Sequence, residues 1–240
     1  QQTVQTSLLT GLVGGVILVV LGIVLARPML TLMKTPDEVI EGAVLYMRVY
    51  FIGMPATMIY NFGAAVLGAV GDTRRPLYFL MAAGVMNVLG DLLFVCVLGM
   101  GVAGVALATV LSQCVSAALT VLCLTGSDGM CHLDIRRLRF YPERFAQIMK
   151  IGLPAGMQSV IFNISNVLIQ SSINSFGAVA VAGNTAAANV ESFVYISMNS
   201  LYQTTLSFTS QNLGAKQYRR VDGILVRCMI LVILIGVVLG

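Results

Sequence analysis

The sequence predicts an all-α protein that crosses a membrane several times as a bundle of about seven helices. Of its 240 residues, 58% are hydrophobic and 10% are charged, whereas soluble domains carry about 25% charged residues. The mean hydropathy is +0.90, and long runs without charge, such as residues 8–26, separate the polar segments. This composition excludes a disordered chain, a disulfide-stapled secreted domain and a nucleic-acid-binding protein, whose phosphate contacts need clustered Lys and Arg.

Seven stretches reach or approach the roughly 20 mostly apolar residues that a membrane-spanning helix needs. They are residues 7–26, 43–68, 77–98, 101–124, 151–175, 180–208 and 223–240. Arg27-Pro28 opens the connector after the first stretch, and Thr35 or Asp37 is predicted to start the second helix. Gly99-Met100-Gly101 leaves room only for a tight hairpin between the third and fourth helices, and Ser175-Phe176-Gly177 predicts another between the fifth and sixth.

The distribution of basic residues predicts how the helices are oriented in the membrane. Eleven of the 14 Lys and Arg residues lie in three segments, 71–76, 126–150 and 212–227. Alternating spans place all three segments on one side, and the positive-inside rule makes that side cytoplasmic. We therefore expect a multi-pass protein of the plasma (inner) membrane with cytoplasmic loops at 71–76, 126–150 and 212–222.

The polar stretch 126–150 is predicted to divide the chain into two parts. Residues 1–125 hold four helices, and residues 151–240 hold the first helices of a second group that the end of the sequence cuts short. Phe140, Phe145 and Ile148 have near-helical spacing, which suggests an amphipathic helix at the interface, although a linker between two transporter halves is the simpler interpretation. Residues 3–22 and 221–240 are similar at an offset of 218 residues, which predicts a two-repeat parent protein.

Two acidic residues, Asp91 and Glu191, fall inside predicted spans, where a carboxylate costs about 2.5–3.5 kcal/mol and usually faces a functional interior. Asp91 and Thr109 lie nine residues on either side of Met100, so the hairpin should place them level, with Asn87 one turn deeper. Their oxygen atoms suit a small cation such as Na⁺, or a proton shared with water. The alternative is a hydrogen-bond network that joins two helices.

A second set of polar residues recurs at helical spacing in stretches 151–175 and 180–208. The set comprises Gln158, Ser159, Asn163, Asn166, Gln170 and Asn174, followed by Asn184, Glu191, Tyr195, Asn199 and Tyr202. Asn163 and Glu191 lie fourteen residues on either side of Gly177 and should be level. Such a stripe cannot face lipid, so it lines a helix seam or a wet cavity; Glu191 favours the cavity.

Motifs of enzymes and cofactor sites are missing from this sequence. No Cys or His spacing suits a transition-metal site, and no P-loop, GxSxG elbow or HExxH motif supports ATP-driven transport or hydrolase chemistry. We therefore expect neither an enzyme nor a bound cofactor.

Several motifs together resemble the multidrug and toxic compound extrusion (MATE) family. They are Pro55, GDTRRP at 71–76, Asn87-xxx-Asp91, GMGVAGVALAT at 99–109 with Gln113, IGLPAG at 151–156 and QNLGA at 211–215. The resemblance implies a two-lobe antiporter of twelve helices that exports amphipathic organic cations and drugs in exchange for Na⁺ or H⁺. The seven stretches here would correspond to the third to ninth of those helices.

The resemblance also implies roles for single residues. Asn87, Asp91 and Thr109 match three members of the family's cation site, whose fourth member is an Asp on the first helix. Tyr46 lies near the position of a cavity tyrosine. The family often has an acidic residue on the seventh helix, where this sequence has Phe162 and Asn163, and Glu191 is a candidate substitute. Gln158, Asn166 and Tyr195 are expected to line the substrate cavity beside them.

The function expected for the parent protein is antiport of a small-molecule drug across the bilayer. Five helices of the family pattern are absent from these 240 residues, so we expect the chain alone to be inactive and to need those helices as partners. A lipid-linked saccharide flippase of the same superfamily would carry several bases inside its spans, where only Arg48 lies. A polytopic membrane scaffold or enzyme would need a soluble domain or a reactive cluster.

Overall fold

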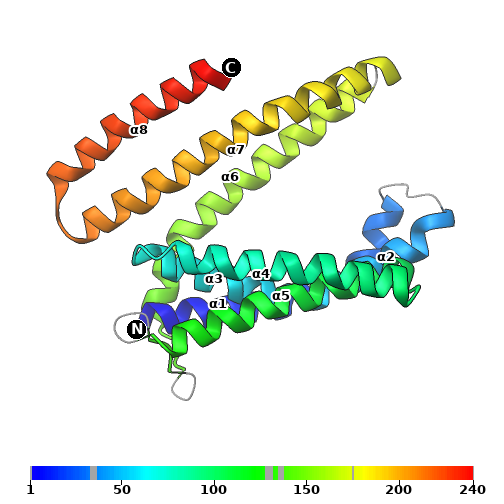
Figure 1. Ribbon diagram of the computed structural model, residues 1–240, viewed down its shortest axis with the longest axis horizontal. Helices are drawn as coiled ribbons and strands as arrows, with labels where there is room; N and C mark the ends of the chain where they lie inside the picture. Colours follow the sequence, from blue (N-terminus) through cyan, green and yellow to red (C-terminus); the bar gives the residue numbers. More distant parts are fainter. Residues whose placement is uncertain (1, 33–36, 128–131, 135–137, 175, 240) are drawn as a thin grey trace. The chain divides into compact units, whose positions relative to one another are not determined.

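The computed structural model describes residues 2–32, 37–127, 132–134, 138–174 and 176–239, and within these ranges all regular structure is helical (Figure 1). The elements are α1 (Gln2–Leu32), α2 (Asp37–Ile52), α3 (Met54–Ala69), α4 (Arg74–Asp91), the π-helix η1 (Leu92–Val97), α5 (Gly101–Thr125), α6 (Pro142–Asn174), α7 (Ala178–Gly214) and α8 (Tyr218–Leu239). The predicted all-α fold is confirmed, and the described residues of the predicted stretches are helical except for Gly53, where stretch 43–68 divides into α2 and α3, and Leu98 after η1.

Some predictions concern residues that the structure does not describe. These are Thr35 as a helix start, Ser175 in the second hairpin, parts of the 126–150 stretch and the side chain of Asn174. Asp37, the other predicted start of the second helix, is the first residue of α2.

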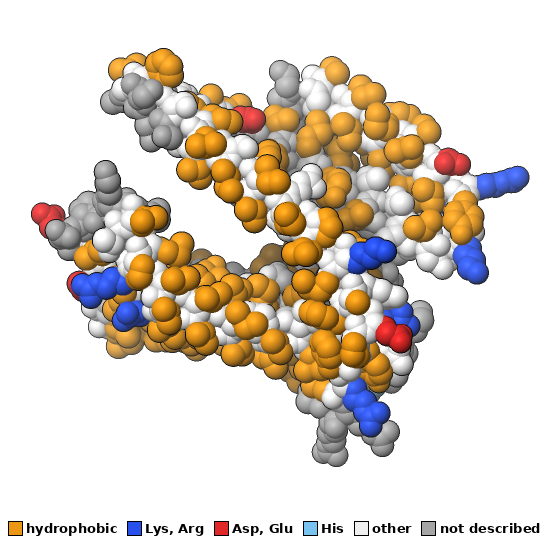
Figure 2. Space-filling model, turned by 180° about the vertical axis from the view of Figure 1, so that it is seen from behind, with side chains coloured by type: hydrophobic (Ala, Val, Ile, Leu, Met, Phe, Trp, Pro, Cys, Tyr) orange, Lys and Arg blue, Asp and Glu red, His pale blue; other side chains and the backbone are white. Residues whose placement is uncertain are grey.

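Four helical segments within the described ranges are long and apolar enough to cross a membrane: α1, α4 continued by η1, α5 and α8. A fifth span results if α2 and α3, which meet at a 45° bend, are counted together. The two long helices α6 and α7 are less apolar, because polar residues recur along both of them. Figure 2 shows hydrophobic side chains along the helices and Lys and Arg near helix ends, the pattern of a membrane helix bundle.

The expectation that α1 ends near Arg27-Pro28 is wrong. The helix continues through Pro28 to Leu32. Proline removes one backbone hydrogen bond from a helix, and membrane helices tolerate that loss where neighbouring groups compensate. Arg27 Nη2 lies 3.0 Å from Glu41 Oε1, which connects the end of α1 to α2.

The helices group into two compact units, Gln1–Ile148 and Met149–Gly240. The boundary between them falls inside the stretch that the sequence assigned to a linker, whose role as a linker stays a prediction. Phe145 and Ile148 belong to the first turns of α6, so no separate interfacial helix forms at these two residues.

In the first unit, α1 packs on α2 and α3, and α5 packs on α2, α3 and α4. Small residues permit these close contacts, as is common between membrane helices. A Cβ atom added to Gly15 of α1 would lie 2.5 Å from Pro55 Cα of α3. Leu67 and Leu124 are almost fully buried at the centre of the small core of this unit.

In the second unit, α7 packs on α8, whereas the described residues of α6 and α7 make few close backbone contacts. The glycines of the predicted hairpins adopt positive φ angles: 63° at Gly99, 55° at Gly101 and 91° at Gly177. Glycine populates this region at little cost, which explains its presence at both turns.

Candidate functional site

The α4–α5 hairpin brings together two of the three predicted cation ligands. Asn87 Nδ2 of α4 donates a hydrogen bond to Thr109 Oγ1 of α5 over 3.5 Å. Thr109 Oγ1 in turn donates to the Val105 carbonyl oxygen over 2.9 Å. The helices approach closely here because Gly90 faces Ala108, and a Cβ atom on Gly90 would lie 3.0 Å from the Ala108 Cβ.

Asp91 follows Asn87 by one helical turn on the same side of α4. Its Oδ1 atom is buried, and among the described residues no hydrogen-bond partner reaches it. Buried polar atoms almost always have a partner in native proteins, and leaving a charged one unpaired is costly. A cation or a proton would therefore stabilise this hairpin most if it bound at the Asp91 carboxylate.

The hairpin register is shifted from equal spacing about Met100, because Gly90 faces Ala108 and Thr109 bonds to Asn87. The predicted pairing of Asp91 with Thr109 stays a prediction. The cause of the shift is η1, which begins directly after Asp91 and contains wider turns, as in the hydrogen bond from Leu98 N to Leu93 O at 3.0 Å. A π-helix has i→i+5 bonds and more residues per turn, so it rises less per residue. The residue of α4 that lies level with Thr109 is therefore further from the turn, in number of residues, than Thr109 itself.

A cavity of about 390 Å³ lies beside this hairpin in the first unit. Its polar lining comprises Thr57, Tyr60, Asn61, Asn87, Thr109, Ser112, Gln113 and Ser116. Pockets of this size are large enough for a small drug-like molecule. Asn87 and Thr109 thus belong both to the candidate cation site and to the cavity wall.

Gln113 of α5 lines this cavity and also lies against Gly53, the residue between α2 and α3. Its Oε1 atom is buried and has no hydrogen-bond partner among the described residues. A Cβ atom on Gly53 would lie 2.5 Å from this oxygen. Gly53 therefore allows the amide to approach the backbone at the bend.

The cavity residues of α3 were not among the predicted site residues. The Tyr60 hydroxyl donates a hydrogen bond to the Pro76 carbonyl oxygen over 3.1 Å, which connects α3 to α4. Asn61 lies in the lining beside it. The available signal was the helical spacing of Thr57, Tyr60 and Asn61 within an otherwise apolar stretch.

Tyr46, the predicted cavity tyrosine, lies on α2. Its ring stacks on Tyr50 with a centroid separation of 6.1 Å and an interplanar angle of 13°. It is not part of the lining of the cavity beside α4 and α5. Its assignment to a substrate cavity stays a prediction.

The other predicted cavity residues lie on exposed faces of the second unit. Gln158, Asn163 and Asn166 are on α6, and Glu191 and Tyr195 are on α7. Asn163 Nδ2 donates to the Ser159 carbonyl oxygen over 2.8 Å within its own helix, and within the described ranges no hydrogen bond joins Asn163 to Glu191. Their contribution to a substrate cavity stays a prediction.

The chemistry of the candidate site suits a light cation better than a transition metal. The described part of the chain contains no group of three or more His, Cys, Asp and Glu side chains that could hold a metal ion. The hairpin instead offers a carboxylate, an amide and a hydroxyl, which are oxygen ligands of the kind that hard cations prefer.

Comparisons with known proteins agree with this architecture. A family model described as MatE matches residues 1–93 and 154–240. The first matched range includes Asn87 and Asp91, and Thr109 lies between the two ranges.

Two proteins of Bacillus subtilis (strain 168) are similar in sequence. "Probable multidrug resistance protein YpnP" is 34% identical over 200 residues, which cover 83% of this chain and 44% of that protein. "Probable multidrug resistance protein YoeA" is 29% identical over 231 residues, covering 92% of this chain and 50% of that protein. The chain spans about half the length of these relatives.

Solved structures give the same fold. A structure titled "Outward-facing conformation of a multidrug resistance MATE family transporter of the MOP superfamily" matches with a TM-score of 0.88 at 22% identity, covering 99% of this chain and 53% of that one. The chain therefore belongs to the MatE family, the multidrug and toxic compound extrusion transporters, which are multi-pass membrane proteins and not enzymes.

Proposed function

We propose that this chain acts, together with the remaining helices of a MATE transporter, in secondary active antiport. The exported substrates are amphipathic organic cations or drugs, and the coupling ion is Na⁺ or H⁺. The names of the two Bacillus relatives support a drug substrate. The support from the molecule itself is the polar cavity of the first unit and the Asp91 carboxylate, which lies one helical turn from Asn87 in the cavity lining.

The observation that carries the proposal is the buried Asp91 Oδ1 atom, which has no hydrogen-bond partner in the described part of the chain. It lies one helical turn from Asn87, the donor of the Asn87–Thr109 hydrogen bond. A Na⁺ ion bound at this oxygen would supply the missing positive charge. A proton would supply the missing hydrogen-bond donor. Either one neutralises a carboxylate within the membrane, where an uncompensated charge is costly.

Coupling between ion and drug follows from residues that both would use. Asn87 and Thr109 line the cavity and are hydrogen-bonded to each other, and Asn87 lies one helical turn from Asp91 on α4. When a cation draws the Asn87 amide oxygen or the Thr109 hydroxyl toward Asp91, the cavity wall changes, and the drug loses affinity for that conformation. Two ligands that favour different arrangements of shared residues weaken each other's binding, which is a positive, unfavourable coupling free energy, and the effect is reciprocal. This is the thermodynamic requirement of an antiporter.

The orientation in the membrane is part of the proposal. The basic residues of the 71–76, 126–150 and 212–222 loops support a cytoplasmic position for all three loops. The plasma (inner) membrane is the proposed location.

The test is the substitution Asp91→Asn in the full-length protein, reconstituted in vesicles with separately clamped Na⁺ and pH gradients. Efflux of a fluorescent organic cation should lose its dependence on the driving ion, because asparagine is isosteric but carries no charge and binds no proton. Glu143→Gln, at an exposed carboxylate in the first turn of α6, is the matched control and should transport normally. Efflux and ion dependence that are unchanged in Asp91→Asn would refute the assignment.

A further inference from the structure

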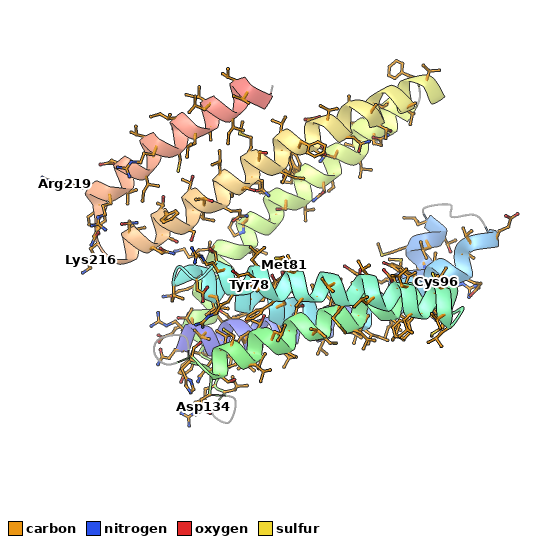
Figure 3. All side chains as sticks on the ribbon, viewed as in Figure 1. Tyr78, Met81, Cys96, Asp134, Lys216 and Arg219 are labelled. Atoms are coloured by element: carbon orange, nitrogen blue, oxygen red, sulfur yellow. The ribbon has the colours of Figure 1, made fainter. Side chains whose placement is uncertain are left out.

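A second and larger cavity, of about 700 Å³, lies at the turn between α7 and α8 in the second unit. Its polar lining comprises Gln211, Asn212, Gln217, Arg219, Arg220 and Arg227. Figure 3 shows Lys216 and Arg219 at this turn. None of these residues takes part in the candidate cation site, which belongs to the first unit.

The arginines of this cavity follow the spacing of one face of α8. Arg220 and Arg227 are seven residues apart, which corresponds to two helical turns and a rise of about 10 Å. Gly223 lies one turn after Arg220 on the same face, and a Cβ atom added there would meet no other atom within 4 Å. The glycine therefore leaves open space between two guanidinium groups.

The charge of this cavity is uncompensated. Within the described ranges, Arg219, Arg220 and Arg227 form no ion pair, and no carboxylate belongs to the lining. All three side chains are exposed and accessible. Asp222, which is also on α8, is exposed and does not line the cavity. The cavity opens at the first turns of α8, and the N-terminal end of a helix dipole adds further positive potential.

We propose that this cavity binds a phosphate group, and that an anionic phospholipid headgroup is the source its position favours. Guanidinium groups bind phosphate oxygens through paired, charge-assisted hydrogen bonds. The cavity lies at one end of α8, whose apolar span places that end at the membrane surface. Basic pockets between helices at this depth are suited to lipid headgroups. The proposal is independent of the transport function.

The probes are phosphatidylglycerol, which is anionic, phosphatidylcholine, which is zwitterionic, and inorganic phosphate. Each is titrated into the delipidated chain in mild detergent, and dissociation constants are measured by native mass spectrometry. We expect phosphatidylglycerol to bind and phosphatidylcholine to bind at least tenfold more weakly. The double substitution Arg220→Gln with Arg227→Gln should weaken phosphatidylglycerol binding at least about thirtyfold, since each guanidinium group loses its charge-assisted hydrogen bonds to the phosphate oxygens.

Two further variants separate binding in the cavity from a general effect of charge or folding. Lys216→Gln removes a positive charge from the same turn without touching the lining, and should change the dissociation constant less than twofold. Gly223→Leu keeps every charge but fills the space between the arginines, and should weaken binding at least tenfold. Far-ultraviolet circular dichroism checks that each variant keeps its helical content.

The arms of the experiment also identify the source of the phosphate. Displacement of phosphatidylglycerol by inorganic phosphate supports recognition of the phosphate group itself. Binding of inorganic phosphate alone, abolished in the double arginine variant, assigns the cavity to a free phosphate compound. The proposal is overturned if neither probe binds, or if the double arginine variant or Gly223→Leu binds phosphatidylglycerol as tightly as the unmodified chain.

Discussion

The contact between Gly90 and Ala108 is predicted to control the stability of the candidate site, and Gly90→Ala tests it. The new methyl group would lie 3.0 Å from the Ala108 Cβ, whereas carbon atoms pack best at about 3.5–4.0 Å. The two helices would have to separate by about 0.5–1 Å. The Asn87–Thr109 hydrogen bond is already 3.5 Å long, so the same movement would break it.

The expected free energies can be worked from these contacts. Overpacking costs about 1–3 kcal/mol, and an interhelical hydrogen bond in a membrane protein contributes about 0.6 kcal/mol. Replacing a helical glycine by alanine gains about 0.5–1 kcal/mol. Gly90→Ala should therefore lower the free energy of unfolding by about 0.6–3 kcal/mol. Gly84→Ala, on the same helix with no atom within 4 Å of its added Cβ, should raise it instead.

The assay is unfolding of the purified chain in detergent micelles by increasing SDS, followed by circular dichroism. A second substitution, Ala108→Gly, removes the opposing methyl group and should restore most of the stability lost in Gly90→Ala. The reasoning fails if Gly90→Ala is as stable as Gly84→Ala. It also fails if Ala108→Gly makes the Gly90→Ala variant less stable still.

Two more predictions concern neighbouring contacts. Thr109→Val keeps the side-chain shape but removes the acceptor of the Asn87 amide hydrogen bond, and should lower the free energy of unfolding by about 0.6 kcal/mol. In the full-length protein it should also raise the Na⁺ or H⁺ concentration needed for half-maximal efflux. An unchanged ion dependence would contradict a role for this hydroxyl. Gly53→Ala places a methyl group 2.5 Å from Gln113 Oε1 and should lower the free energy of unfolding, measured in SDS, by about 1–3 kcal/mol. Adding Gln113→Ala should restore part of this stability. If it does not, Gly53 is needed for another reason.

Sequence spacing was sufficient to place Asn87, Asp91 and Thr109 on one hairpin. Gly99 and Gly101 allow only a short antiparallel turn, so helices on either side of them must pack together. The register of that hairpin could not be predicted, because the π-helical turns of η1 change the rise between Asp91 and the turn. Nothing in the residue types from Leu92 to Val97 distinguishes a π-helix from an α-helix.

The cavity of the first unit depended on contacts that local patterns do not contain. Residues 43–68 read as one apolar span, whereas the structure bends this stretch at Gly53 and directs Tyr60 and Asn61 to the cavity shared with α5. The break itself has a local cause, because Pro55 in the first turn of α3 cannot donate a backbone hydrogen bond to α2. The approach of Gln113, sixty residues later in the sequence, to Gly53 is a tertiary contact that the missing glycine side chain permits. A contact between distant residues of this kind has no signature in either segment alone.

By itself, the sequence determined the membrane class, the positions of the helices and the glycine turns, since these depend on hydropathy and backbone freedom within short segments. Only the tertiary structure decided which polar atoms meet. It paired Asn87 with Thr109, left Asp91 Oδ1 without a hydrogen-bond partner among the described residues, and placed three arginines around a cavity at the start of α8. The physical reason is that hydropathy belongs to a segment, whereas hydrogen bonds, burial and cavities depend on the depth and rotation of two helices relative to each other.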